Sequence, residues 1–382
     1  MNCSIERNRS CRYRPGQMAT NTYWDYLKLD RLLSLQGGIE GDEAALMPDE
    51  LHFIIVHQAF ELWFKLSLRE LRLARDHLAE PRVPEEKIPY VVHHLRRVTT
   101  ILELAVDQFK VMETLTPQDF LAFRDKLIPA SGFQSFQMRE LEILLGLRDE
   151  ARLDYGGTDP LEHLKSLAVD SPGGKLAWQR ISDARAETSL KSALEEWLYR
   201  TPVQGSSPDD PSDDGAVNDF LEDYFRAMQE LNVSKKQRML AALGKITDGI
   251  ERQFADGEAY ARRFLFAEDV PEAARARAKR VRAGVLFVES YRELPLLAWP
   301  RLLLDTVVEA EEQLVIWRSR HARMVERIIG RRIGTGGSSG VDYLDRTARY
   351  RIFTDLWAVR TILLPKDALP ELRQPEAYGF AR

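Results

Sequence analysis

ELHFIIVHQAFELWFK, residues 50–65, places apolar side chains at intervals of three and four residues, which is the periodicity of an α-helix. That spacing brings Phe53, Phe60 and Phe64 to the side of the helix that carries His57. Three aromatic rings around one imidazole would form a flat apolar slot, which suits a planar aromatic ligand or a macrocycle. Ordinary aromatic packing in a helix core is the alternative, and periodicity alone favours it.

A second histidine lies in the same kind of apolar setting. His321 shares its helical face with Leu314, Trp317, Met324, Val325 and Ile328. A core histidine bonded to a backbone carbonyl is the usual interpretation of such a position. Thirteen residues later the chain runs GTGGSSG, residues 334–340, a flexible loop that is rich in hydrogen-bond donors. Together, the histidine and the loop indicate a candidate metal ligand beside a segment able to close over a substrate.

Helical periodicity continues along nearly the whole chain, and no strand pattern of any length appears. We therefore predict an all-α fold, a large helical bundle in a single domain over residues 19–382. The acidic stretch GSSPDDPSDDG, residues 205–215, predicts a solvated, mobile loop spanning about 203–216. The expected helices cover residues 21–36, 48–79, 86–113, 117–128, 135–145, 160–200 with a break at 172–174, 216–243, 245–266, 271–292, 299–331 and 343–363.

Composition narrows the functional class. The net charge of −5 over 382 residues gives no reason to expect nucleic-acid binding, and no stretch approaches a membrane span. Both cysteines, Cys3 and Cys11, fall in a polar tail at residues 1–18, which we expect to be disordered. A disulfide framework or a cysteine-based zinc site is therefore not expected, and the cytoplasm fits. The tail has no apolar core, so it does not resemble a signal peptide.

The candidate sites differ in how specific they are. His321 and His57 could be the axial and distal groups of a haem pocket, whereas a zinc site would need further ligands that neither histidine has nearby. Arg124 lies among aromatic residues and could pair with a carboxylate, although a structural salt bridge is commoner. The glycine loop lacks the lysine and the preceding strand of a nucleotide-binding loop, so nucleotide binding is discarded.

Five segments of the chain resemble the tryptophan 2,3-dioxygenase family. The motifs PASGFQS at 129–135 and GTGGSSG at 334–340 are long and specific, and they stand in the right order between the right helices. The resemblance covers nearly the whole chain apart from the tail and the acidic loop. The segments are YWDYLKLDRLLSLQ (23–36), DELHFIIVHQAFELWFK (49–65), TLTPQDFLAFRDKLIPASGFQSFQMRELEILLG (114–146), WRSRHARMVERIIGRRIGTGGSSGVDYL (317–344) and residues 353–365.

The resemblance implies a homotetramer with one haem b per subunit. It implies that ferrous haem and O2 insert both oxygen atoms across the indole C2–C3 bond of L-tryptophan, giving N-formyl-L-kynurenine. His321 matches the proximal iron ligand, and Ser131 matches a small polar residue near the haem edge. Trp317, Met324 and Val325 share the face of His321 and are expected to contact the cofactor.

The resemblance also assigns the substrate contacts. His57 matches the distal histidine that hydrogen-bonds the indole N–H, and Phe53 matches the aromatic that packs on the indole. Arg124 matches the partner of the substrate carboxylate, while Thr335 matches a group that contacts the substrate ammonium and carboxylate. The residues matching the helix that lines a neighbouring subunit's pocket are Tyr23, Tyr26 and Leu27.

Two alternatives remain open on the sequence. One is a haem monooxygenase acting on tryptophan or a substituted tryptophan, such as a methylated one, to give a hydroxylated or oxindole product. The other is a non-catalytic haem sensor, which would not need Arg124 and Thr335 together with Phe53. A fold does not fix the reaction it supports, so the mass of the product separates the first alternative from dioxygenation.

Overall fold

The computed structural model describes residues 22–153, 160–169, 171–336 and 340–379. The chain divides into two compact units, the first ending at Ile55 and the second running from Val56 to Arg382, and each is described by itself. The tail at residues 1–18 lies outside the described residues, as do residues 337–339 of the glycine loop.

The first unit holds two short helices, α1 (Tyr23–Leu27) and α2 (Leu29–Leu32), the 3-10 turn η1 (Glu43–Ala45) and the beginning of α3 (Glu50–Leu78). Thr22 caps α1 by accepting a hydrogen bond from the backbone N–H of Asp25 at 3.3 Å. The single helix predicted over residues 21–36 is wrong, because Lys28 takes a left-handed conformation with φ of 55° and interrupts it.

The second unit is helical throughout, which confirms the all-α prediction. Over the described ranges the only extended pairing is an isolated bridge between Val203 and Ser206. Its helices after α3 are α4 (Ile88–Met112), α5 (Pro117–Phe123), α6 (Phe136–Leu145), α7 (Pro160–Leu167), α8 (Pro172–Ala186), α9 (Leu190–Arg200), α10 (Asp213–Leu243), α11 (Asp248–Leu265), α12 (Glu272–Ser290), α13 (Ala298–Ile329), α14 (Val341–Thr347) and α15 (Thr354–Ile362).

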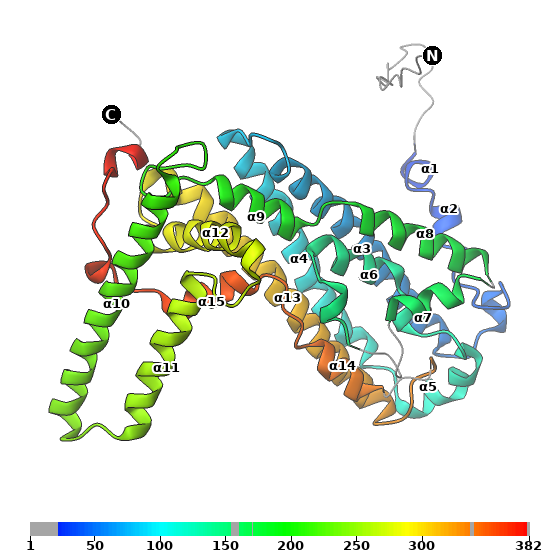
Figure 1. Cartoon of the computed structure of the whole chain (residues 1–382). Coiled ribbons are helices and arrows are strands. Elements are labelled where there is room, and N and C mark those ends of the chain that lie inside the picture. Colours follow the sequence, from blue (N-terminus) through cyan, green and yellow to red (C-terminus); the bar gives the residue numbers. More distant parts are fainter. Residues whose placement is uncertain (1–21, 154–159, 170, 337–339, 380–382) are drawn as a thin grey trace, which may run out of the picture. The chain divides into compact units, whose positions relative to one another are not determined.

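The long pair α4 and α13 forms the centre of this unit, and the two helices run alongside each other (Figure 1). Side chains at three- and four-residue intervals bury one face of α4, in the pattern of a helix packed against neighbours. Those side chains are Ile88, Val91, Val92, Leu95, Val98, Ile101, Leu102, Ala105, Phe109 and Met112. Because α13 carries His321, this packing fixes the helix on which the site is built.

Two predicted segments are divided differently in the structure. The segment 160–200 has two breaks, since α8 begins at Pro172 and ends before Ser189 caps α9. The helix predicted over residues 343–363 is two helices, α14 and α15. They are separated because the buried Glu311 of α13 accepts hydrogen bonds from the backbone N–H of Phe353 at 3.3 Å and from the indole of Trp357 at 2.5 Å. A tertiary contact therefore bends the chain at a point where the local pattern continues.

The acidic stretch at residues 205–215 is bonded to α12 at its C-terminal end. Helix α10 begins at Asp213, earlier than predicted, and Asp213 is buried. Its carboxylate accepts from the Arg280 guanidinium of α12 at 2.9 Å and from the Ser206 hydroxyl at 2.9 Å. Residues 209–212 are exposed, as the predicted solvation requires, but both ends of the predicted loop are packed, since Val203, Gln204, Ser206 and Asp213 are buried.

Candidate functional site

His321 lies in α13 among aromatic side chains. The ring of Phe109 stacks on it with centroids 5.8 Å apart and planes 9° apart, and Trp317 lies 5.1 Å away. Its side chain remains partly accessible although protein surrounds it, as expected of a group that lines an internal space. Burial, together with the nearby His57 and Arg139, lowers the pKa of His321 to about 4. The imidazole is therefore neutral at physiological pH and has a lone pair available for a metal.

The aromatic slot predicted around His57 joins α3 to α13. Phe60 and Phe64 lie on α3 with ring centroids 6.2 Å apart, and both meet the edge of the Trp317 ring, at 5.9 and 5.7 Å. His57 is close enough to His321 to influence its pKa. The structure therefore brings together the two histidines that the sequence singled out, with an apolar aromatic wall beside them.

The residues around His321 fit a haem. The indole N–H of Trp317 and the Nε–H of Arg139 are buried and have no hydrogen-bond partner among the described residues. Unsatisfied buried donors are costly, so a polar acceptor placed beside either of them would be favourable. Carboxylates such as the haem propionates would satisfy both donors, and His321 would supply the nitrogen ligand.

Two other residues predicted to contact the cofactor also lie on α13, one turn beyond His321. Met324 is buried and Val325 is half-buried. Both follow His321 on the face that the sequence identified. The described part of the chain contains no cluster of three or more histidine, cysteine or acidic residues able to hold a metal ion.

Arg139 is held in place by a buried carboxylate. Glu142 of α6 accepts from Arg139 at 3.1 Å, Arg152 at 2.6 Å and Arg318 of α13 at 2.7 Å. Burial alone would raise the pKa of Glu142, but the arginines together lower it to about 2. One carboxylate thus ties α6 to the helix of His321. Arg139 and Glu142 were not identified from the sequence, although both fall within the segment 114–146.

The predicted carboxylate partner and the glycine loop lie together. The guanidinium of Arg124 donates to the backbone carbonyl of Ile333 at 2.5 Å, and the hydroxyl of Thr335 donates to the carbonyl of Ala130 at 2.6 Å. The Nε–H of Arg124 is buried without a partner among the described residues. Ser131 caps the 3-10 turn η4 (Gly132–Gln134) by accepting from the N–H of Phe133 at 3.3 Å. Thr335 of the glycine loop therefore contacts the PASGFQS motif beside Arg124, whose Nε–H has no partner among the described residues.

The remaining predicted substrate contacts belong to the first unit. Phe53 is half-buried and lies four residues before His57 in the same helix, α3. On α1, Tyr23 is 71% exposed, Tyr26 is 76% exposed and Leu27 is 41% exposed. A short helix that shows its aromatic side chains to solvent is unusual for a lone chain, and such patches commonly mark a surface for another chain.

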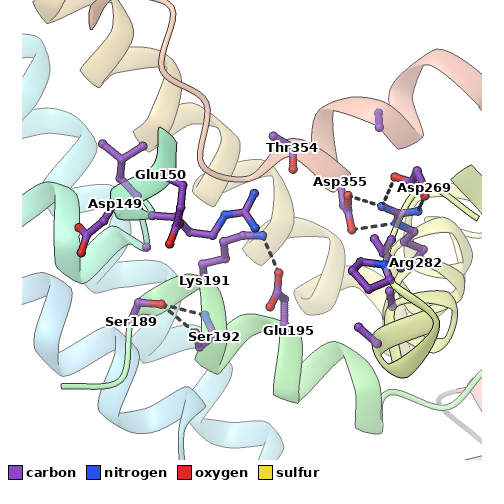
Figure 2. Close-up of a pocket in the computed structure, with 18 of the residues that line it drawn as sticks. Asp149, Glu150, Ser189, Lys191, Ser192, Glu195, Asp269, Arg282, Thr354 and Asp355 are labelled. Carbon is purple, nitrogen blue, oxygen red and sulfur yellow. Dashed lines mark hydrogen bonds and ion pairs between the residues drawn. The ribbon is translucent and has the colours of Figure 1, made fainter. Parts of the chain in front are cut away.

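A separate polar cleft of about 1210 Å³ is lined by residues from the ends of α6, α9, α11, α12 and α15 (Figure 2). Its charged side chains largely pair with one another. Lys191 binds Glu195 at 2.6 Å, and Arg282 binds Asp269 and Asp355. None of the residues predicted for the haem or the substrate lines this cleft. The candidate site is therefore the space around His57 and His321.

Comparison with known proteins identifies the family. The model of the family described as tryptophan 2,3-dioxygenase matches residues 10–363. The chain is 49% identical over 365 residues to a tryptophan 2,3-dioxygenase of Sorangium cellulosum, covering 94% of this chain and 87% of that protein. It is 50% identical over 385 residues to tryptophan 2,3-dioxygenase 2 of Ralstonia nicotianae, covering 95% and 99%.

A shorter relative matches part of the chain. The tryptophan 2,3-dioxygenase-like protein of Xanthomonas campestris is 49% identical over 273 residues, which is 70% of this chain and 98% of that protein. No helix among the described residues is long and apolar enough to cross a membrane. The match over nearly the whole length confirms the resemblance drawn from the two sequence motifs. This chain belongs to the tryptophan 2,3-dioxygenase family.

Proposed function

We propose that this protein is a haem-dependent dioxygenase that inserts both atoms of O2 across the indole C2–C3 bond of L-tryptophan, giving N-formyl-L-kynurenine. The family match supports the reaction. The observation that carries the assignment to a site is the meeting of His57 and His321 in one aromatic space, with Arg124 beside the glycine loop. Neither alternative drawn from the sequence is favoured by a further observation.

In this proposal the haem is held by His321, with Trp317 and Arg139 donating to its carboxylates and Met324 and Val325 packing against it. When bound, haem b supplies a ferrous iron that activates dioxygen. The protein's part is to keep His321 neutral and to hold its ring at a fixed orientation. Burial accomplishes the first, and the parallel stacking of Phe109 accomplishes the second.

The substrate's charged end requires a partner because an unpaired charge in an apolar space is costly. Arg124 meets this need with a guanidinium that can bind a carboxylate through two parallel hydrogen bonds. Thr335 contributes a hydroxyl from the loop that lies against Arg124 and Ala130. Ser131 keeps the short turn beside the loop in shape. With Phe53 packed on the indole, the amino acid is fixed at both ends.

His57 positions the indole N–H and does not remove its proton before reaction. The indole N–H is far too weak an acid for a neutral imidazole to ionise it in the ground state. A hydrogen bond that orients the ring and strengthens as the ring is attacked is sufficient. The aromatic rings of Phe60, Phe64 and Trp317 leave little room for water on their side of the histidines, which would protect the oxygen chemistry from side reactions.

We further propose a homotetramer in which α1 of one subunit covers the pocket of another. The strongly exposed aromatic rings of Tyr23 and Tyr26 support this arrangement, since burial between subunits would remove them from water. Leu27 extends the same surface.

One experiment tests the reaction. The haem-loaded protein is given L-tryptophan and 18O2, and the product mass is measured after a single turnover. Incorporation of two labelled oxygen atoms is expected, whereas one labelled atom would mean monooxygenation and none would mean a sensor. The companion variant His321→Ala is expected to lose haem, because α13 contains no other histidine. Retention of a histidine-ligated five-coordinate spectrum by that variant would contradict the cofactor assignment.

A further inference from the structure

The turn of α3 that carries His57 is held from outside at both ends. The side-chain amide of Gln108, on α4, donates to the backbone carbonyl of Val56 at 2.7 Å. The side-chain amide of Gln137, on α6, donates to the carbonyl of Glu61 at 2.7 Å. A helix carbonyl has a second lone pair after its helical hydrogen bond, so both contacts add to the helix without breaking it. The peptide group between Val56 and His57 is therefore tied to α4, and the peptide group that follows Glu61, about one turn later, is tied to α6.

The same stretch of α4 also reaches His321. Phe109, which follows Gln108, is fully buried and stacks on the His321 ring at 5.8 Å and 9°. Four residues later, Glu113 binds the guanidinium of Arg320, the residue before His321, at 2.7 Å. Three residues within a span of six, at the C-terminal end of α4 and its C-cap, thus contact the residue before His57, the ring of His321 and the residue before His321.

We propose that Gln108, Phe109 and Glu113, named here the α4 splint, are positioning residues that set the separation and relative orientation of His57 and His321. The inference rests on the proposed function, in which His321 holds the haem and His57 holds the indole N–H. In that reaction the substrate ring and the iron must meet at a fixed spacing, and small displacements are costly in rate. A rigid helix whose adjacent residues contact the peptide group before His57 and the ring of His321 provides such a spacing.

The splint differs from the other contact to the same turn. Gln137 also holds the turn of His57, but it comes from α6, and no contact of its side chain reaches His321. Loss of Gln137 is therefore expected to disturb His57 alone. Loss of Gln108 removes the hydrogen bond between α4 and the peptide group before His57 and leaves the ring contact of Phe60 with Phe109 to join these two helices beside His57, so the two histidines are expected to shift relative to each other.

The test compares Gln108→Met with Gln137→Met, using Thr99→Val as the control. Thr99 lies on α4 and bonds only within its own helix, to the carbonyl of Leu95 at 3.1 Å. In the ferrous haem protein, the C–O stretching frequency of bound carbon monoxide reports the surroundings of His57, and the iron–histidine stretching frequency reports His321. Gln108→Met is expected to move both frequencies, Gln137→Met only the first and Thr99→Val neither.

Turnover gives a second measurement. Gln108→Met is expected to lower kcat about tenfold and to leave KM for tryptophan within about twofold, because Arg124 still anchors the substrate. If Gln108→Met, Gln137→Met and Thr99→Val all show the same change in kcat and the same change in KM, the cause is a general loss of stability and not a loss of positioning. Should Gln108→Met fail to fold, Gln108→Asn, whose shorter side chain does not reach Val56, carries the same expectation.

A third measurement separates this inference from the proposed function. The imidazole nitrogen resonances of His57 and His321 in the haem-free chain should both shift in Gln108→Met and stay unchanged in Thr99→Val. If neither resonance and neither frequency moves in Gln108→Met, the splint is rejected. A wild-type chain that binds no haem would reject the proposed function, and the imidazole resonances would still decide the splint.

Discussion

At the scale of single residues, Arg124 carries the most specific expectation. Arg124→Leu removes the partner of the substrate carboxylate and leaves the indole contacts in place. A charge-assisted pair of this kind contributes about 1.5–3 kcal/mol, so the Kd for L-tryptophan should rise roughly 10–150-fold. The Kd for 3-methylindole, which lacks the amino-acid backbone, should stay almost unchanged. Titration of both ligands checks this, and equal losses would move Arg124 out of the site.

His57 is expected to affect turnover without affecting the cofactor. His57→Ala removes a hydrogen bond of about 1–3 kcal/mol, which corresponds to a roughly 5–150-fold lower kcat. Haem quantification beside a steady-state assay makes the comparison. Loss of haem would show that the roles of His57 and His321 are exchanged. Complete loss of chemistry with haem and tryptophan both bound would show instead that His57 acts as an obligatory base.

The residues of the site were predictable to different degrees. His57 and His321 could be found because helical spacing places each on an apolar face, and Arg124 and Thr335 because the motifs beside them are specific. Arg139 and Gln108 could not, because their contacts depend on which helices meet. A lone arginine or glutamine on a helix is usually on the surface. Sequence periodicity predicts which face is buried and says little about which polar side chain crosses to another helix.

At the scale of helices, Glu142 joins α6 to α13 through three arginines. Glu142→Gln leaves those buried cations without their counter-charge, and the free energy of unfolding should fall by about 3–5 kcal/mol. Glu195→Gln, which removes a partly exposed i,i+4 pair with Lys191, should cost less than about 1 kcal/mol. Urea denaturation of both variants checks the difference, and similar midpoints would contradict the buried network.

Replacement of Glu289, on α12, is expected to stabilise the fold, whereas replacement of Glu142 destabilises it. It is buried, its Oε1 atom has no hydrogen-bond partner among the described residues, and burial and Asp305 raise its pKa despite Arg360, Arg292 and Arg301. A raised folded-state pKa means that stability falls as pH rises from the unfolded value of 4.5 towards the folded one. Glu289→Gln removes this cost.

Thermal unfolding at several pH values measures the difference between Glu289→Gln and the wild type. The advantage of the variant should be small near pH 4 and should grow as pH rises, until the wild-type carboxyl is fully ionised in the folded state. A difference in Tm that stays constant with pH would show that Glu289 does not titrate with a raised pKa. Thr99→Val, which changes no titratable group, serves as the control whose pH profile should follow the wild type.

Helix boundaries show where local pattern stops being informative. The faces of α4 and α13 were predictable because many buried residues repeat the same spacing. The break at Lys28 was not, since lysine has no preference for positive φ that would mark it. The division between α14 and α15 depends on Glu311, about forty residues earlier in the chain. Tertiary contacts determine both the division between α14 and α15 and the early start of α10 at Asp213.

At the scale of the whole molecule, assembly is the testable property. Removal of residues 1–18 leaves α1 intact and should be tolerated, whereas removal of residues 1–30 deletes α1 and should abolish activity. Light scattering should show a tetramer for the wild type and for the shorter deletion. A fully active monomer would contradict the proposed assembly. Retained activity after the longer deletion would show that α1 does not complete the pocket.

The hydrogen bond from Arg124 to the carbonyl of Ile333 has a consequence for affinity. In the proposed role, a substrate carboxylate arrives at a guanidinium that already donates one N–H to Ile333, while its Nε–H has no partner among the described residues. A carboxylate that takes only the Nε–H leaves the Ile333 carbonyl in place. A carboxylate that binds through two parallel hydrogen bonds and takes the engaged N–H as well displaces that carbonyl, and the measured Kd is then weaker than the intrinsic attraction by the strength of the bond to Ile333. In that second case, substrate capture and release of the chain at Ile333, two residues before Thr335, are one coupled equilibrium.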